Sequence, residues 1–294
     1  MSFIICKEVL IVTYLMSAIL GLVQGVAEFL PISSSGHLTL LQHFFGMEEP
    51  DQLFNILLHF ATLLAVCIYY FQDVLGMILE FFRGIAAMFS RQPGQGEPPE
   101  TRRLVFLVIV GTLPLFLILP VKKYVEGLGS SPVFVSFALL VTGCILFLSD
   151  RMATGRKTAR SATVKDVLLV GVAQGIATIP GLSRSGCTIS AGMALGFRRE
   201  FAVRYSFLMS LPAVFGATLL EVKDTLSAGA GIPDGMLGKY LLGMVIAGVV
   251  GYFAIRLVNL LANKGKFGAF AYYCWIAGVL FLVLSLLGVT FVPA

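Results

Sequence analysis

Two stretches of the sequence, GLVQGVAEFLPISSSGH at residues 21–37 and GVAQGIATIPGLSRSGC at residues 171–187, are copies of one pattern. An offset of 150 positions aligns them without a gap and leaves seven identical residues in seventeen. Self-similarity of this kind indicates a duplicated structural unit. The chain is therefore predicted to form a single domain, 1–294, with a first repeat at about 9–150 and a second at about 160–294.

The composition places this domain in a membrane. Of the 294 residues, 57% are apolar and 13% are charged, whereas a soluble domain has roughly 45–50% apolar and about 25% charged residues. Lipid admits only helices or closed barrels as spanning structures. Unbroken apolar stretches such as Leu104–Pro120 and Tyr240–Leu261 lack the alternation of barrel strands. The prediction is an all-α polytopic membrane protein.

The net charge of +5 follows from basic residues that lie mostly in short loops and helix ends, the usual cytoplasmic bias of membrane proteins. No nucleic-acid partner is expected. The largest basic cluster, between Arg151 and Lys165, is placed on the cytoplasmic side. A weaker cluster of Arg91, Arg102 and Arg103 is expected on the same side, because two candidate spans separate the clusters.

Two apolar segments of the second repeat are too short to cross a bilayer alone. Val167–Ile179 and Thr188–Phe197 each adjoin a stretch rich in Pro, Gly and Ser, whereas a spanning helix needs about 20 residues. Short broken segments are typical of re-entrant helices buried in protein. With one re-entrant region in each repeat, the halves would have inverted topology and share a site at their interface.

The first repeat carries an acidic group inside an apolar segment. Gln24 and Glu28 are four residues apart and therefore share one face of a helix. A carboxylate within the membrane is costly and by default marks a functional site. The structural alternative is a hydrogen bond between helices.

The motif that follows is Pro31-Ile32-Ser33-Ser34-Ser35-Gly36-His37. Its hydroxyls form a candidate hydrogen-bonding cradle, with a nucleophile or acid/base candidate at its end. The alternative is a serine-rich helix cap. His59, within another apolar segment, is a candidate for a supporting role beside the site or for a satisfied buried histidine.

The second repeat supplies a cation where the first supplies a carboxylate. Its motif, Ser183-Arg184-Ser185-Gly186-Cys187-Thr188, places a guanidinium among hydroxyls and backbone amides. These are the groups that bind phosphate or carboxylate. The alternative is an arginine that snorkels to the membrane interface.

Together these motifs resemble those of the undecaprenyl-diphosphate phosphatase family, often called bacitracin-resistance proteins. The likeness rests on Gln24-x-x-x-Glu28 leading to Pro31-x-Ser33-Ser34-Ser35-Gly36-His37, and on Pro180-Gly181-x-Ser183-Arg184-Ser185-x-x-Thr188. The stretch Leu58-His59-x-Ala61-Thr62-Leu63 also resembles the segment that follows the first motif in this family. The resemblance spans nearly the full chain. The family accepts Glu or Gln at the first position, and Gln24 is the uncharged option.

The resemblance implies hydrolysis of a C55 polyprenyl diphosphate to the monophosphate and inorganic phosphate, which recycles the lipid carrier of cell-wall synthesis. It also implies an inverted-topology repeat with two re-entrant helix regions, and a divalent cation, Mg²⁺ or Ca²⁺. The expected location is the bacterial cytoplasmic (inner) membrane, with the site facing the periplasm. The polyprenyl diphosphate and the bilayer are the expected partners, and a homodimer is left open.

The site residues expected on this basis fall into two groups. Those expected to be catalytic are Glu28, Ser34, His37 and Arg184, with Glu28 also holding the cation. Those expected to bind substrate are Gln24, Ser33, Ser35, Ser183, Ser185 and Thr188. The nucleophile is Ser34 with His37 as proton relay, or His37 itself, or a water activated by Glu28.

Two other functions compete with this one. A flippase or transporter of a polyprenyl phosphate would use the same architecture and the same arginine without cleaving its ligand. The phosphatidic acid phosphatase group has superficially similar motifs, but it needs a histidine after its Ser-Arg motif. No histidine follows His59, so that group is rejected.

Overall fold

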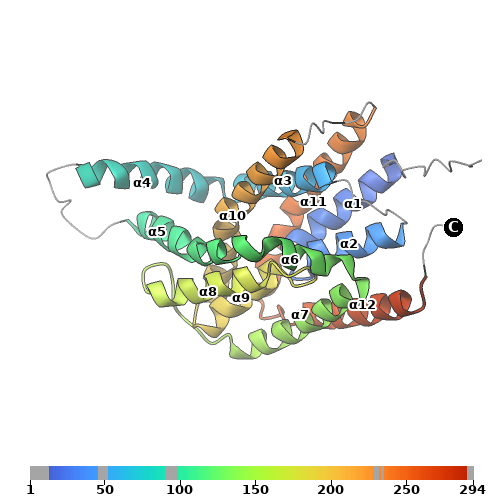
Figure 1. Cartoon of the computed structure of the whole chain (residues 1–294). Helices are drawn as coiled ribbons and strands as arrows, with labels where there is room; N and C mark the ends of the chain where they lie inside the picture. The colour runs from blue at the N-terminus through green and yellow to red at the C-terminus, as the bar shows by residue number, and fades with distance from the viewer. Residues whose placement is uncertain (1–12, 46–51, 90–98, 228–231, 233–234, 290–294) are drawn as a thin grey trace, which may run out of the picture.

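The computed structural model describes residues 13–45, 52–89, 99–227, 232 and 235–289. Apart from an isolated bridge between Lys157 and Phe197, the regular structure of these residues is helical. In order, the elements are α1 (Tyr14–Phe29), α2 (Ser34–Phe44), α3 (Gln52–Tyr69), α4 (Phe71–Phe89), α5 (Glu100–Thr112), η1 (Leu113–Leu117), η2 (Leu119–Val121), α6 (Lys122–Gly127), η3 (Leu128–Ser130), α7 (Pro132–Met152), α8 (Val164–Ile176), α9 (Arg184–Ala194), α10 (Arg199–Ser227), α11 (Leu237–Asn263) and α12 (Ala269–Leu286). Figure 1 shows their arrangement.

Within the described ranges, five helical segments are long and apolar enough to cross a membrane. A sixth candidate is the pair α3 and α4, which meets at a break with a bend of 88°. The chain is thus an all-α, multi-pass membrane protein, as its composition predicts. Of the basic cluster near residue 91, Arg91 lies outside the described residues.

The duplicated motifs fold into two helix–turn–helix units of the same design. In the first unit α1 leads through a turn into α2, and in the second α8 leads into α9; both second helices have 11 residues. The predicted segment Thr188–Phe197 begins too late, because Ser183 caps the helix and α9 starts at Arg184. Both α2 and α9 are too short to span a bilayer. Inversion of the two halves across the membrane stays a prediction.

Each unit packs against a helix of the other repeat. The helix α1 of the first repeat lies along α11 of the second, while α8 of the second repeat lies along α5 and η1 of the first. The helices α7 and α12 pair with each other. The repeats are therefore interlocked rather than placed side by side.

Glycines at the same repeat position make both crossings possible. A methyl group at Gly21 would lie 3.0 Å from the Cα atom of Gly243 on α11, and nearer still to its carbonyl oxygen. At the equivalent Gly171, a methyl group would lie 2.9 Å from a ring carbon of Pro114 and would overlap the carbonyl oxygen of Gly111. Small residues allow helix backbones to approach closely in membranes. The identity of Gly21 with Gly171 in the repeat thus reflects a packing constraint.

Described residues of the two basic clusters lie together at one end of the molecule, called the basic end below. Arg103 donates to the carbonyl oxygens of Ala159 and Ala162 at 2.8 Å each, and Arg160 pairs with Glu100 at 3.3 Å. These contacts join the start of α5 to the loop before α8. The prediction that the two basic clusters share one side is confirmed for Arg103 and the loop before α8.

Candidate active site

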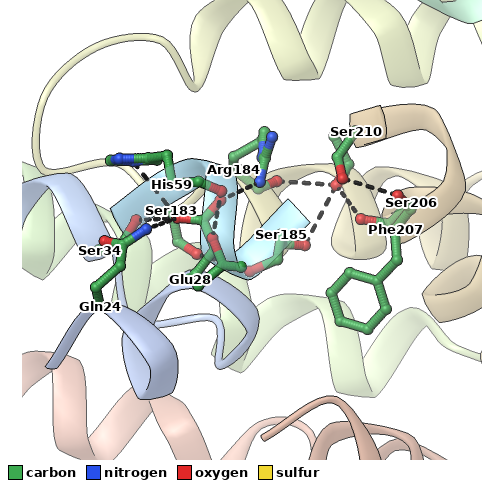
Figure 2. Close-up of polar contacts among 12 residues, drawn as sticks. Gln24, Glu28, Ser34, His59, Ser183, Arg184, Ser185, Ser206, Phe207 and Ser210 are labelled. Carbon is green, nitrogen blue, oxygen red and sulfur yellow. Dashed lines mark hydrogen bonds and ion pairs between the residues drawn. The ribbon is translucent and has the colours of Figure 1, made fainter. Parts of the chain in front are cut away.

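The site centres on Glu28 in the last turn of α1. Its side chain is 7% exposed, and its carboxylate accepts hydrogen bonds from Nε2 of Gln24 at 3.0 Å and from Oγ of Ser34 at 2.7 Å. Figure 2 shows these side chains converging on the carboxylate. The four-residue spacing places Gln24 on the same helix face, as the sequence predicts.

Arg184 closes the site from the other repeat. Its guanidinium forms an ion pair with Oε1 of Glu28. On α3, His59 donates from Nδ1 to the carbonyl of Asn55 at 2.9 Å and presents Nε2 at 3.7 Å from Oε2 of Glu28. Glu28 therefore contacts two repeats and three helices besides its own, namely α2, α3 and α9.

Two helix N-termini point toward this carboxylate. Ser34 and Arg184 occupy equivalent repeat positions and are the first residues of α2 and α9. Both reach Glu28. The first turn of a helix carries unpaired N–H groups and a partial positive charge. Together with a guanidinium, two such ends create a strong site for a polyanion.

The serine before each of these helices is its N-cap. Oγ of Ser33 accepts from the amide of Gly36 at 3.1 Å, and Oγ of Ser183 accepts from Gly186 at 3.0 Å. Helix capping, the alternative given for the first motif, is therefore correct for Ser33, and Ser183 caps α9 in the same way. It is compatible with a site, because the cap fixes where the helix end points.

Ser33 also has an unusual backbone. Its φ of 71° makes it the one non-glycine residue with a positive φ in the described part of the chain. Such a conformation costs on the order of 1–3 kcal/mol and persists where surrounding structure imposes it. Strain at the turn beside Glu28 is consistent with a functional site.

The remaining serines and the threonine of the motifs contact the turns. Ser35 lies 3.4 Å from Ser33 and Ser185 lies 3.3 Å from Ser183, measured between Oγ atoms. Ser35 is exposed, whereas Ser185 is buried. Oγ1 of Thr188 donates to the carbonyl of Arg184 at 2.8 Å and lies 2.6 Å from Oγ of Ser206, which can donate to it. Thr188 therefore connects the first turn of α9, which carries Arg184, to Ser206 on α10.

His37 lies on another side of α2. Its Nδ1 donates to the carbonyl of Ser33 at 2.8 Å, and its Nε2 lies 2.9 Å from the hydroxyl of Tyr273 on α12. The two rings stack with centroids 5.6 Å apart. Both nitrogens are engaged in these contacts, so the imidazole that faces Glu28 here is that of His59.

The oxygen groups at Glu28 suit a hard cation. Oε1 of Gln24 is buried and accepts no hydrogen bond, beside a carboxylate and the Ser34 hydroxyl. Within the described residues, no group of three or more His, Cys, Asp or Glu could hold a metal. Mg²⁺ commonly uses one or two carboxylates together with substrate phosphates, so this donor set fits it.

Two neighbours of the site were not predicted from the sequence. Tyr273 reaches His37 from 236 positions away, and Ser206 reaches Thr188 from α10. Neither belongs to a motif, and each is one of several tyrosines or serines in apolar helices. The sequence alone contains no signal that would have selected them.

Comparison with known proteins identifies relatives over nearly the whole chain. A family model described as bacitracin resistance protein BacA matches residues 17–280. A protein of Halothermothrix orenii is 41% identical over 267 residues, 90% of this chain and 96% of its own. One from Methanosphaera stadtmanae is 39% identical over 280 residues, with 92% and 98% covered. Both are named undecaprenyl-diphosphatase.

Proposed function

Since this chain belongs to the bacitracin resistance protein BacA family, we propose that Glu28, Ser34 and Arg184 form the site at which it hydrolyses undecaprenyl diphosphate. The protein is an undecaprenyl-diphosphatase, an integral membrane phosphatase. Its products are undecaprenyl phosphate and inorganic phosphate, so it returns the lipid carrier to cell-wall synthesis.

The observation that carries the site assignment is the convergence of two helix N-termini and one guanidinium on Glu28. Phosphoryl transfer depends chiefly on positioning and on stabilising charge. In the proposed complex, Arg184 releases Glu28 and binds the diphosphate bidentately. The free amides at the starts of α2 and α9 bind further oxygens, and the buried capping serines Ser33 and Ser183 hold those ends in place.

Ser34 is the proposed nucleophile, because its hydroxyl already donates to a carboxylate. Its Oγ attacks the terminal phosphorus while its proton passes to Glu28. The bond between that phosphorus and the bridging oxygen breaks, and undecaprenyl phosphate leaves. Glu28 passes that proton to the departing undecaprenyl phosphate. Water then attacks the phosphoserine while Glu28 accepts its proton, the bond between phosphorus and Oγ breaks, and Glu28 returns the proton to Ser34 as inorganic phosphate leaves. His37 acts as a positioning residue that fixes the carbonyl of Ser33.

A divalent cation, Mg²⁺ or Ca²⁺, would be held by Glu28 and the free amide oxygen of Gln24. When bound, it neutralises charge on the diphosphate. We further place the protein in the bacterial cytoplasmic membrane, with its basic end in the cytoplasm and the substrate entering from the opposite face. The bias of basic residues toward cytoplasmic loops supports this orientation.

The test is phosphate release from C55 diphosphate by the purified protein in detergent, with Mg²⁺ and with a chelator. Arg184→Ala should lower kcat/KM by about 10²–10³-fold, the usual cost of losing one such charge-stabilising donor. Arg198→Ala is the matched control, because Arg198 pairs with Glu200 on the surface. Folded wild-type protein that binds the lipid without releasing phosphate would instead indicate a transporter.

A further inference from the structure

A groove on α11 lies apart from the candidate active site. It has a volume of about 530 Å³ and includes Tyr69, Phe253, Arg256, Leu260 and Asn263 in its lining. Tyr69 follows His59 by ten residues on the same helix, α3. At 1.5 Å per residue, the groove begins about 15 Å along α3 from the histidine that faces Glu28. We call it the Arg256 groove.

Arg256 has no counter-ion among the described residues. No hydrogen bond or ion pair involves its side chain in the described part of the chain, and no acidic residue lines the groove. By contrast, Arg204 nearby contacts both carboxylate oxygens of Asp73, at 3.0 and 2.5 Å. Arg256 is exposed and lies seven residues before the end of α11, so its guanidinium can reach the membrane surface and is available to an anion there.

Exposed apolar side chains run beside this cation. Phe253, Leu257 and Leu260 follow one another at intervals of four and three residues, so they form a stripe along one face of α11. They are 59%, 42% and 50% exposed. Arg256 and Asn263, seven residues apart, form an adjacent polar edge. The groove thus offers hydrogen-bond donors next to an apolar track.

The groove lies toward the basic end of the molecule. Lys264 and Lys266 follow directly after α11 and offset the partial negative charge of its C-terminus. On a membrane-spanning helix, the molecules that surround such a groove are lipids. A phosphate headgroup complements the cationic edge, and an acyl chain complements the apolar stripe.

We propose that the Arg256 groove binds an anionic phospholipid, with the headgroup phosphate on Arg256 and an acyl chain along the apolar stripe. This site is distinct from the one that hydrolyses the diphosphate. Its ligand bridges α3 and α11, because Tyr69 and Arg256 line the same groove. Binding should therefore stabilise the fold without being needed for basal turnover.

The experiment measures retention of lipid on the full-length protein in detergent by native mass spectrometry and by thermal unfolding. The probes are phosphatidylglycerol, phosphatidylcholine and inorganic phosphate. Both lipids carry a phosphodiester, but the choline cation of phosphatidylcholine cancels its net negative charge and would lie close to Arg256. A preference of about ten-fold or more for phosphatidylglycerol is therefore expected. Arg256→Gln should abolish this preference, and Arg256→Lys should keep most of it. Arg156→Gln, an exposed arginine outside the groove, is the matched control.

Phosphate release in detergent should be unchanged in Arg256→Gln, which also shows that the variant is folded. An equal preference in wild type and Arg256→Gln would overturn the proposal. So would equal retention of both lipids by the wild type, which would show that the groove does not select a net anionic headgroup. Stabilisation by inorganic phosphate alone, to the same extent as by phosphatidylglycerol, would overturn the lipid assignment.

Discussion

The carboxylate of Glu28 and the guanidinium of Arg184 are ion-paired although 156 positions of sequence separate them. The pair joins the end of α1 to the start of α9, with side chains 7% and 24% exposed. In this arrangement the cation that would bind a diphosphate is held by the protein's own anion. In the proposed complex, substrate would therefore compete with Glu28 for Arg184, and the released carboxylate would become available as a base.

Replacing Glu28 separates its role as the ion-pair partner of Arg184 from its proposed role as a base. Glu28→Gln should lower kcat by about 100-fold or more, within the range of lost general-base catalysis, because Ser34 loses its proton acceptor. At a Mg²⁺ concentration that saturates the variant, KM should not rise, because Arg184 no longer has to leave an anion. Steady-state kinetics that resolve kcat from KM check this. A kcat within about three-fold of wild type would contradict the assignment of Glu28 as the general base, because that loss is far below the one expected for general-base catalysis. The control is Glu200→Gln, which removes an exposed carboxylate.

Substitution of two neighbouring serines, Ser34 and Ser35, should have very different effects on phosphate release. Ser34→Ala removes the hydroxyl that donates to Glu28 and should reduce phosphate release by at least about 10³-fold, since the covalent route is lost. Ser35→Ala removes an exposed hydroxyl whose recorded contact is with Ser33 and should cost less than about five-fold, roughly one weak hydrogen bond. Equal effects in the two variants would exclude Ser34 as the nucleophile.

The crossing of α1 and α11 should tolerate no side chain at Gly21. Gly21→Ala should lower the free energy of unfolding by about 1–3 kcal/mol, the usual cost of overpacking, because its methyl group meets the backbone of Gly243. In Gly216→Ala a methyl group meets no atom within 4 Å, so this control should be neutral or gain up to about 1 kcal/mol. Unfolding of both variants in detergent provides the measurement.

The contribution of Asp166, at the start of α8, to the stability of the fold should be lost in acid. Burial raises the pKa of the Asp166 carboxyl, but hydrogen bonds from Thr163 and the ammonium of Lys157 outweigh it and hold the pKa below its ordinary value. The stabilisation is present above the unfolded pKa of about 3.9 and is lost as pH falls through the folded pKa. Asp166→Asn should lower the unfolding midpoint at pH 7, and the difference from wild type should shrink below about pH 4. A difference independent of pH would disprove this role.

The sequence predicts the membrane class, the short helices and most of the candidate site, because these depend on local composition and on residue types within two motifs. It places Gln24, Glu28 and Arg184 together through the repeat and the resemblance. It does not place His37 beside Tyr273, because this contact depends on how helices pack across the molecule. His59, a candidate for a supporting role beside the site, does lie 3.7 Å from Glu28. The apolar pattern places the segment at Thr188–Phe197, because the polar residues before Thr188 interrupt it. In the structure Ser183 caps the helix, and Arg184 is its first residue.

The interlocking of α1 with α11 also constrains how the protein is made. During synthesis α1 leaves the ribosome more than 200 residues before α11, so its glycine face has no permanent neighbour while most of the chain is still being translated. The carboxylate of Glu28 likewise has no ion-pair partner until Arg184 has been synthesised. Until then, the insertion machinery or a temporary helix contact has to keep the glycine face of α1 and the Glu28 carboxylate out of contact with lipid. Final assembly is therefore expected late, after the last two helices have entered the bilayer.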